Sequence, residues 1–509
     1  MERRLEQKEE NMTHSKRIKE RGAAIYVTAC ILVMAVPMAG LAIDGTVLYI
    51  LKCRLQGAVD GAALAAARSL ARGSDDTAQV SSAKIAAVTY TKLNFPSNYF
   101  FTSDVTIDQN TDVTVDLSVA HQRTVSVTGH VVAPVLFMRF LNFTSANVNA
   151  IAIAVRKDVN VNLVLDRSGS MTASGSCGPM KQAAINFLGN FAPGRDNVGI
   201  VSFATSTMVQ QAATTSFTQA GMTTAINGID CQGSTSSAAA LWTAYDDLVR
   251  LNQTAALNFI VFFTDGEPTG VAANMPIASG SPCTETVQVV PPASVPAGFP
   301  SGFTGKYITG MYATYVDNSA FIGLAANTAT ANADGTPPTS TTSSGVSDQV
   351  LAPNSQGCAY ASSWNSNWQT LTDFRGIPTV DIYGNNLINN GYWPVTLNAA
   401  GYIDITNHSN GIPLAVNASD DSARRIRIGT VDPAYGRGLS GVIINSIGLG
   451  NAAVPLPSDG IFLERVSNDT RSPIYDSNYP AGLYVWAQHS SDISGAFGQI
   501  ASEILRLAK

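Results

Sequence analysis

The sequence is poor in the groups that most enzymes and nucleic-acid-binding proteins use. Charged residues make up only 13% of the 509 residues, and the net charge of −6 leaves no basic surface for a nucleic acid. Five scattered histidines and no Cys-x-x-Cys pair argue against a zinc site. The chain also lacks a Gly-x-Ser-x-Gly elbow and a Gly-x₄-Gly-Lys-Ser/Thr phosphate loop. We therefore expect no catalytic residues and no nucleic-acid partner.

Long apolar runs are also rare, and the exception lies near the N-terminus. Ala23 to Ile43 carries no charge and is long enough to cross a bilayer of ~30 Å, and its Pro37 is tolerable in a membrane helix. Basic residues between positions 16 and 21 precede it, which predicts a cytoplasmic tail over residues 1–22. A cleaved signal peptide is the alternative, but the run exceeds the usual ~7–15 residues and no small-x-small site follows. We expect a single-pass membrane protein with its N-terminus in the cytoplasm and the bulk of the chain outside.

Beyond the span, the pattern predicts two small elements of structure. A stripe of apolar residues three and four apart indicates a membrane-proximal helix over residues 44–74, packed either on its own domain or on partner helices. Residues 75–157 alternate as half-buried strands do, with a short helix expected at Ala133 to Leu141 and a strand at Val148 to Val155. We interpret this stretch as a small α+β module without visible chemistry, in which His121 and His130 are ordinary histidines.

The candidate chemistry begins after residue 158. Val161 to Leu165 predicts a short strand buried on both faces, and it ends on Asp166, followed by Ser168 and Ser170. A carboxylate and two hydroxyls are hard oxygen ligands that suit Mg²⁺ or Mn²⁺, although a polar turn is the alternative for this pattern alone.

Two distant segments add to this pattern. Asn258 to Asp265 is a second buried strand that ends on a carboxylate, and the loop up to Thr235 presents a third hydroxyl before an apolar helix at Ala238 to Leu248. In this order, Asp-x-Ser-x-Ser, a loop Thr and Thr-Asp-Gly resemble the metal-ion-dependent adhesion site of von Willebrand factor A (VWA) domains.

That resemblance implies a ligand set and a partner. Ser168, Ser170 and Thr235 would reach Mg²⁺ or Mn²⁺ directly, while Asp166 and Asp265 would lie close by, often through water. One coordination position would stay open for a carboxylate that a protein ligand presents.

The resemblance also implies an α/β fold, a doubly wound and mostly parallel sheet in the strand order 3-2-1-4-5-6. The VWA domain would occupy residues 158–268 and 417–509, around an insert at residues 269–416. Scattered aromatics favour a folded, β-rich insert over a low-complexity linker. Because the insert leaves at the carboxyl end of strand 4, where such sheets bind ligands, we expect it to govern partner choice.

A second resemblance covers residues 20–72. Arg21-Gly-Ala-Ala, Gly40-Leu-Ala-Ile-Asp44 and the alanine-rich stretch from Asp60 to Ala67 are similar to the N-terminal region of TadG-like proteins of the Tad (Flp pilus) assembly machinery. Processed pilins carry a Glu five residues after the cleaved Gly, whereas Val27 stands at that position after Gly22. We therefore interpret the segment as a retained anchor and not as a pilus subunit.

Together these features predict a membrane-anchored protein that acts in Tad/Flp pilus assembly or surface adhesion, with other Tad components as partners. The Tad resemblance implies the bacterial inner membrane, with the bulk of the chain periplasmic or at the cell surface. The alternatives are a structural envelope protein and a metal-assisted hydrolase. An extracytoplasmic location permits disulfides, and four outside cysteines allow three pairings. The positions of Cys177 and Cys231 beside the metal-face loops favour a bond between them and a second between Cys283 and Cys358. Cys30 and Cys53 are expected to be unpaired.

Overall fold

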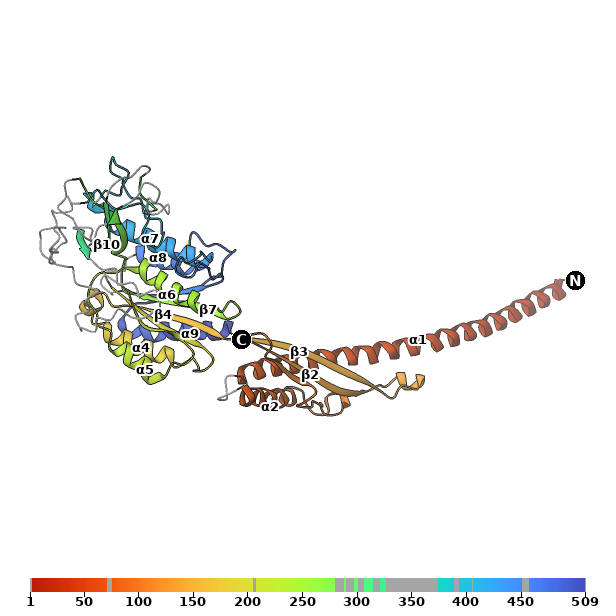
Figure 1. The fold of residues 1–509 in the computed structure, drawn as a ribbon. Helices are drawn as coiled ribbons and strands as arrows, with labels where there is room; N and C mark the ends of the chain where they lie inside the picture. The colour runs from red at the N-terminus through yellow and green to blue at the C-terminus, as the bar shows by residue number, and fades with distance from the viewer. Residues whose placement is uncertain are drawn as a thin grey trace. The chain divides into compact units, whose positions relative to one another are not determined.

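The computed structural model describes residues 2–70, 76–204, 207–279, 288–289, 297–300, 306–314, 321–325, 374–388, 393–404, 406–450 and 457–508. The chain forms two compact units, Met1–Arg156 and Lys157–Ala508. Figure 1 shows the chain with its helices and strands labelled. Each unit is described by itself below.

The first unit is built on one long helix, α1 (Glu2–Ser69), which continues through Pro37. The expected span and the membrane-proximal helix are therefore one element. Every side chain from Tyr26 to Ala39 is exposed. Within the described part of the chain, the Tyr26–Ser69 segment is the helix long and apolar enough to cross a membrane.

The second half of α1 packs on its own domain, which decides between the two interpretations of its apolar stripe. Its buried side chains form a core with α2 (Asp76–Asn94) and with a three-stranded sheet in the order β1-β2-β3. The strands are β1 (Val113–Asp116), β2 (Gln122–Pro134) and β3 (Ser145–Lys157), and a short 3₁₀ turn, η1 (Tyr99–Phe101), follows α2.

The helix expected at Ala133 to Leu141 is wrong over its first half. Alternate residues Val131, Ala133 and Val135 are buried, a period of two, so β2 runs on to Pro134 and only a 3₁₀ turn, η2 (Met138–Leu141), follows. The preceding loop is held by the α1 carboxylate of Asp44, which is 3% exposed. This carboxylate accepts backbone N–H bonds from residues 136, 137 and 138 at 3.0, 2.9 and 2.7 Å.

The second unit contains a six-stranded sheet in the order β13-β12-β7-β4-β5-β6. The strands are β4 (Val159–Asp166), β5 (Asn197–Phe203), β6 (Thr207–Thr214), β7 (Leu257–Thr264), β12 (Ile443–Leu449) and β13 (Tyr484–Ala487). All neighbours are parallel except β6, which pairs antiparallel with β5. In chain order this is 3-2-1-4-5-6, so the expected α/β topology is confirmed.

Helices cover both faces of this sheet, as Figure 1 shows. One core joins α4 (Cys177–Leu188), α5 (Gln219–Asn227) and α9 (Ile493–Leu507) to the sheet, and the other joins α6 (Ser237–Leu251), α7 (Gly411–Arg427) and α8 (Pro457–Ser467). Short turns α3 (Gly169–Ala173), η4 (His408–Asn410) and η5 (Ser490–Asp492) complete the helices. The VWA domain was expected to resume at residue 417, after the insert. Because α7 begins at Gly411, it resumes earlier than expected. The basic residues that marked this helix occupy only its last turns.

The insert is β-rich where it is described, as expected. A further sheet has the order β11-β10-β8, and β9 pairs with β10. Its strands are β8 (Gly270–Pro276), β9 (Gln288–Val289), β10 (Lys306–Thr314) and β11 (Phe321–Ala325). Residues 326–373, with Cys358, lie outside the described residues, and so does Cys283.

Buried asparagines link the amino-terminal ends of the central strands. Asn160 of β4 accepts a 2.8 Å bond from Asn197 of β5 and donates one of 2.8 Å to Asn258 of β7. A register slip would leave these buried amides without partners, so the ladder specifies the pairing of three strands.

The Asp44 contacts predict a local effect of mutation. Asp44→Ala should speed amide hydrogen exchange at residues 136–138 by at least about tenfold, because each bond to a charged acceptor is worth about 1.5–3 kcal/mol. Asp60→Ala is the matched control, since Asp60 is exposed on the same helix and accepts only from Gln56. Unchanged exchange in Asp44→Ala would contradict the assignment of these bonds.

A second prediction concerns Asp246 of α6. Burial, and then the negative charge of Asp432, raise its pKa to about 7. A carboxyl group whose folded pKa exceeds its unfolded value of about 3.9 takes up a proton on folding, so its stabilising contribution is lost as the pH rises from about 4 to 7. Asp246→Asn should therefore raise the melting temperature at pH 8 and leave it nearly unchanged at pH 4.

The measurement is thermal unfolding followed by tryptophan fluorescence, which reports on the second unit because all five tryptophans lie in it. Each kcal/mol of relieved repulsion corresponds to about 2–4 °C. Asp230→Asn, at an exposed carboxylate, is the control and should give no gain specific to pH 8. An equal gain at both pH values would show that Asp246 acts through packing and not through charge.

Candidate functional site

The candidate site lies where two neighbouring parallel strands end. Asp166 is the last residue of β4, and Asp265 follows the last residue of β7. The strands pair in register, with Leu165 opposite Phe263, so both carboxylates stand at the same edge of the sheet. The sheet thus brings together two residues that are far apart in the sequence.

Three side-chain oxygens form a small triangle at this edge. Ser168 Oγ lies 2.9 Å from Ser170 Oγ, and Asp265 Oδ1 lies 2.6 Å from Ser170 Oγ and 3.4 Å from Ser168 Oγ. Gly169 between the serines starts the short helix α3, and its N–H donates to the Gly233 carbonyl at 2.8 Å. The strand end and the loop that follows it therefore present both hydroxyls on the same side.

Asp166 holds in place the loop that carries Ser168 and Ser170, called the serine loop below. Its carboxylate is fully buried and accepts from the Ser168 N–H at 2.7 Å and from the Thr264 hydroxyl at 2.6 Å. The role of Thr264 was missed in the sequence, although it is the first residue of the Thr-Asp-Gly motif. Its hydroxyl ties the end of β7 to the end of β4, so Asp166 is a positioning group with both oxygens engaged.

Thr235 lies on the neighbouring loop and is buried. Its N–H donates to Thr269 Oγ1 at 2.9 Å, and its carbonyl accepts from the N–H groups of Thr269 and Gly270 at 2.8 and 3.0 Å. The Gly169–Gly233 bond connects this loop to the serine loop. The structure thus joins Asp166, Ser168, Ser170 and Asp265 by direct contacts and places Thr235 on the adjoining loop. Thr269 lies outside the motifs and could not be found from the sequence pattern.

The two carboxylates are electrostatically costly in this position. Burial, and then the charge of Asp166, raise the pKa of Asp265 to about 7, and burial likewise raises the pKa of Asp166. A bound cation would offset the mutual repulsion and the desolvation of both groups.

The donor set fits a small divalent cation. An octahedral Mg²⁺ ion with bonds of about 2.0–2.1 Å separates adjacent ligands by about 3 Å. The triangle of Ser168, Ser170 and Asp265 has edges of 2.6 to 3.4 Å, which is the spacing of one octahedral face. Among the residues described, no cluster of three or more His, Cys, Asp or Glu side chains could hold a metal ion.

A disulfide braces the loops around the site. Cys177, at the start of α4, is bonded to Cys231, which precedes the Thr235 loop, so the expected pairing is confirmed. The Thr172 hydroxyl adds a 2.5 Å bond to the Cys231 carbonyl. Cys30 and Cys53 are free, as expected. The bond crosses between the two loops that carry the hydroxyl groups of the site.

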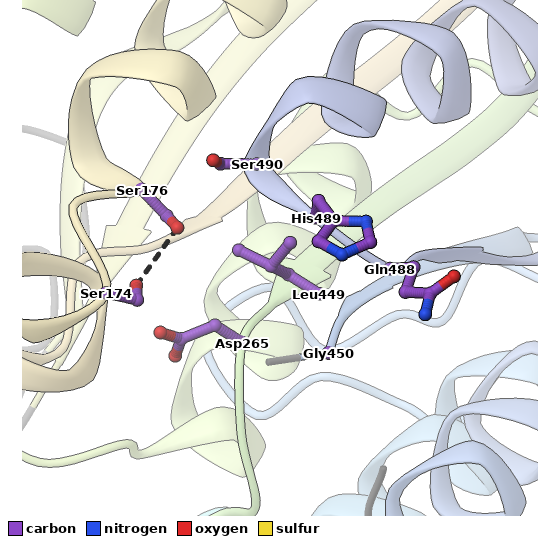
Figure 2. Close-up of a pocket in the computed structure, with 8 residues that line it drawn as sticks. All are labelled: Ser174, Ser176, Asp265, Leu449, Gly450, Gln488, His489 and Ser490. Atoms are coloured by element: carbon purple, nitrogen blue, oxygen red, sulfur yellow. Dashed lines mark hydrogen bonds between the residues drawn. The ribbon is translucent and has the colours of Figure 1, made fainter. Parts of the chain in front are cut away.

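A pocket of about 150 Å³ opens beside Asp265. Figure 2 shows the residues that line it: Ser174, Ser176, Asp265, Leu449, Gly450, Gln488, His489 and Ser490. They come from the α3–α4 turn and from the ends of β12 and β13, so the pocket lies at the carboxyl edge of the sheet. The lining is mostly polar and uncharged, apart from Asp265 and the titratable His489.

Comparisons with known proteins agree with this arrangement. Residues 161–267 match the von Willebrand factor type A domain family, and residues 22–69 match the Flp pilus-assembly TadE/G-like family. The chain therefore carries a TadE/G-like N-terminal segment and a VWA domain. Both expected resemblances are therefore confirmed. Among curated proteins, no sequence matches the chain.

Several solved structures are similar to the chain at low identity. The vWF domain of the type V pili tip protein Mfa5 from Porphyromonas gingivalis is 14% identical, with a TM-score of 0.36, over 70% of this chain and 98% of that one. The pilus adhesin SpaC from Lactobacillus rhamnosus GG is 13% identical, with a TM-score of 0.35, over 80% and 36%. The PilB minor pilin from Streptococcus sanguinis is 13% identical, with a TM-score of 0.34, over 81% of both chains.

Proposed function

We propose that this protein is a non-enzymatic, membrane-anchored binding protein of the Tad/Flp system whose VWA domain holds a protein ligand through Mg²⁺ or Mn²⁺. It acts in pilus assembly or in surface adhesion. The observation that carries the proposal is the oxygen triangle of Ser168, Ser170 and Asp265 at the carboxyl edge of the sheet. Thr235 would complete the protein ligands, and Asp166 would orient the serine loop.

The open side of this triangle supports a carboxylate as the partner's contributing group. A dication held by these oxygens would keep a coordination position for a hard oxygen donor, and a carboxylate of the partner would bind there only while the metal is present. The pocket beside Asp265 would take the part of the partner next to that carboxylate. Its polar lining suits hydrogen bonds and not an apolar anchor.

The insert is placed to influence this contact. Its first residues, Thr269 and Gly270, bond to the backbone of Thr235 and continue directly into β8. A partner that touches the insert would therefore act on a loop that supplies a metal ligand. This supports the expectation that the insert contributes to partner choice.

The proposal predicts metal binding that depends on Asp166. Purified protein should bind Mn²⁺ in a 1:1 ratio and release it to excess Mg²⁺, which electron paramagnetic resonance of free Mn²⁺ can follow. Asp166→Ala should lower the affinity by at least about 10–100-fold, because it removes a group that orients the metal ligands and one of two negative charges. Ser170→Ala should do the same by removing a direct ligand.

The control is Asp230→Ala, which removes an exposed carboxylate near the Thr235 loop and should leave Mn²⁺ binding unchanged. Circular dichroism should show that all variants keep the fold. Equal Mn²⁺ binding by Asp166→Ala and the unaltered protein would exclude the site.

The anchor predicts the topology. Because the basic residues precede the span, the N-terminus should be cytoplasmic and everything beyond Asp44 outside. Protease added to intact spheroplasts should then degrade the VWA domain and spare an N-terminal epitope tag. A protected VWA domain, degraded only after lysis, would show the opposite orientation or a wholly internal protein.

A further inference from the structure

The hairpin that joins β2 to β3 carries exposed apolar side chains at its tip. Leu136 is 61% exposed and Phe143 is 55% exposed, although they lie in the same unit as a well-packed core. Arg139 between them is also exposed, and residues 135–144 contain no acidic side chain. Exposed apolar groups of this size at the end of a rigid hairpin are typical of an interaction surface.

Contacts with Gly40 and Asp44 hold the tip of the hairpin at one position along α1. The Asp44 carboxylate binds three successive N–H groups of the loop, at residues 136–138. One turn earlier, Gly40 allows close packing, because a Cβ at that position would lie 2.5 Å from Phe137. Gly40 and Asp44 flank Ile43, where the uncharged run of α1 ends. The hairpin tip therefore lies level with the last turn of the expected membrane span.

We propose that the tip of the β2–β3 hairpin, with Leu136 and Phe143, inserts into the outer face of the bilayer that α1 crosses. The occupant of this surface is lipid, because the Asp44 and Gly40 contacts hold the tip beside the end of an α1 segment whose side chains are exposed from Tyr26 to Ala39. The interfacial layer is only about 5–8 Å thick on each side of the hydrocarbon, and the Asp44 contacts hold the tip within it.

The chemistry of the tip suits this layer. Burial of a phenylalanine and a leucine at the boundary of the acyl chains is favourable, because it removes apolar surface from water. An arginine can bind the lipid phosphates with its guanidinium while its apolar stem stays near the acyl chains. The Asp44 charge needs no hydration there, since three N–H donors already satisfy it. The tip is thus a second point of membrane contact beside α1, which restricts how the folded part of the unit tilts on the membrane.

The test is site-specific photo-cross-linking in the full-length protein. p-Benzoylphenylalanine is placed at Leu136 or Phe143, and the protein is reconstituted in nanodiscs of phosphatidylethanolamine and phosphatidylglycerol with alkyne-tagged acyl chains. Val33, 73% exposed within the span, is the positive control. Ile153, 65% exposed on β3, is the negative control. Ile153 lies far from the end of the span, because its neighbour Ile151 accepts a hydrogen bond from Gln56 through its backbone carbonyl. Gln56 lies about 20 Å beyond Ile43 along α1, at a helical rise of about 1.5 Å per residue.

We expect lipid adducts at Leu136 and Phe143 comparable to those at Val33, and adducts at Ile153 at least about tenfold lower, since that position lies beyond the interfacial layer. Adducts at Val33 without adducts at the tip would overturn the proposal, and so would adducts of the tip with a second protein chain. Absence of lipid adducts at all four positions would refute both the tip contact and the anchor. None of these outcomes bears on Mn²⁺ binding, so the metal proposal is tested separately.

Discussion

The in-register pairing of β4 with β7 is the constraint on which the candidate site depends. It places Asp166 and Asp265 at one sheet edge, buries Asp166 and partly buries Asp265, at a cost that raises their pKa values. Hydroxyl and backbone donors offset part of that cost, and two of them, from Ser168 and Thr264, fix Asp166. The buried asparagines at the opposite end of the same strands resist a register slip. The asparagines and the carboxylates, about 20 Å or more apart along the strands, thus both depend on the same strand register.

The loops around this edge are braced from several directions, which matters because a metal site needs ligands held in place before the ion arrives. The Cys177–Cys231 disulfide joins the helix after the serine loop to the segment before Thr235. Thr269, at the root of the insert, bonds to the Thr235 backbone on the other side. The root of the insert is therefore part of the support of the site, and it continues directly into β8 of the insert's own sheet.

The sequence predicted several strands and the residues at their ends because buried parallel strands read as continuous apolar runs. The strand order came from the resemblance to VWA domains, which the spacing of the motif residues revealed. The sequence did not predict the contacts of Thr264, Thr269 and the asparagine ladder, since these join positions about 100 residues apart or lie outside any motif. The start of α7 at Gly411 was missed because its first turns are apolar and the pattern of charge began later. Residues 133–137 were mistaken for helix because a short apolar run has no distinctive period.

The stretch Gly40-Leu-Ala-Ile-Asp44 shows how a motif can carry more than its apparent role. In the sequence it looks like the end of a membrane helix, where a glycine weakens the helix and a buried aspartate is costly. In the fold the glycine admits Phe137 and the aspartate satisfies three N–H groups of the hairpin loop. Both costs are therefore offset by one tertiary contact. This contact joins the end of the apolar run to the tip of the β-sheet, so it ties the helix to the module that follows it at the point where the apolar run ends.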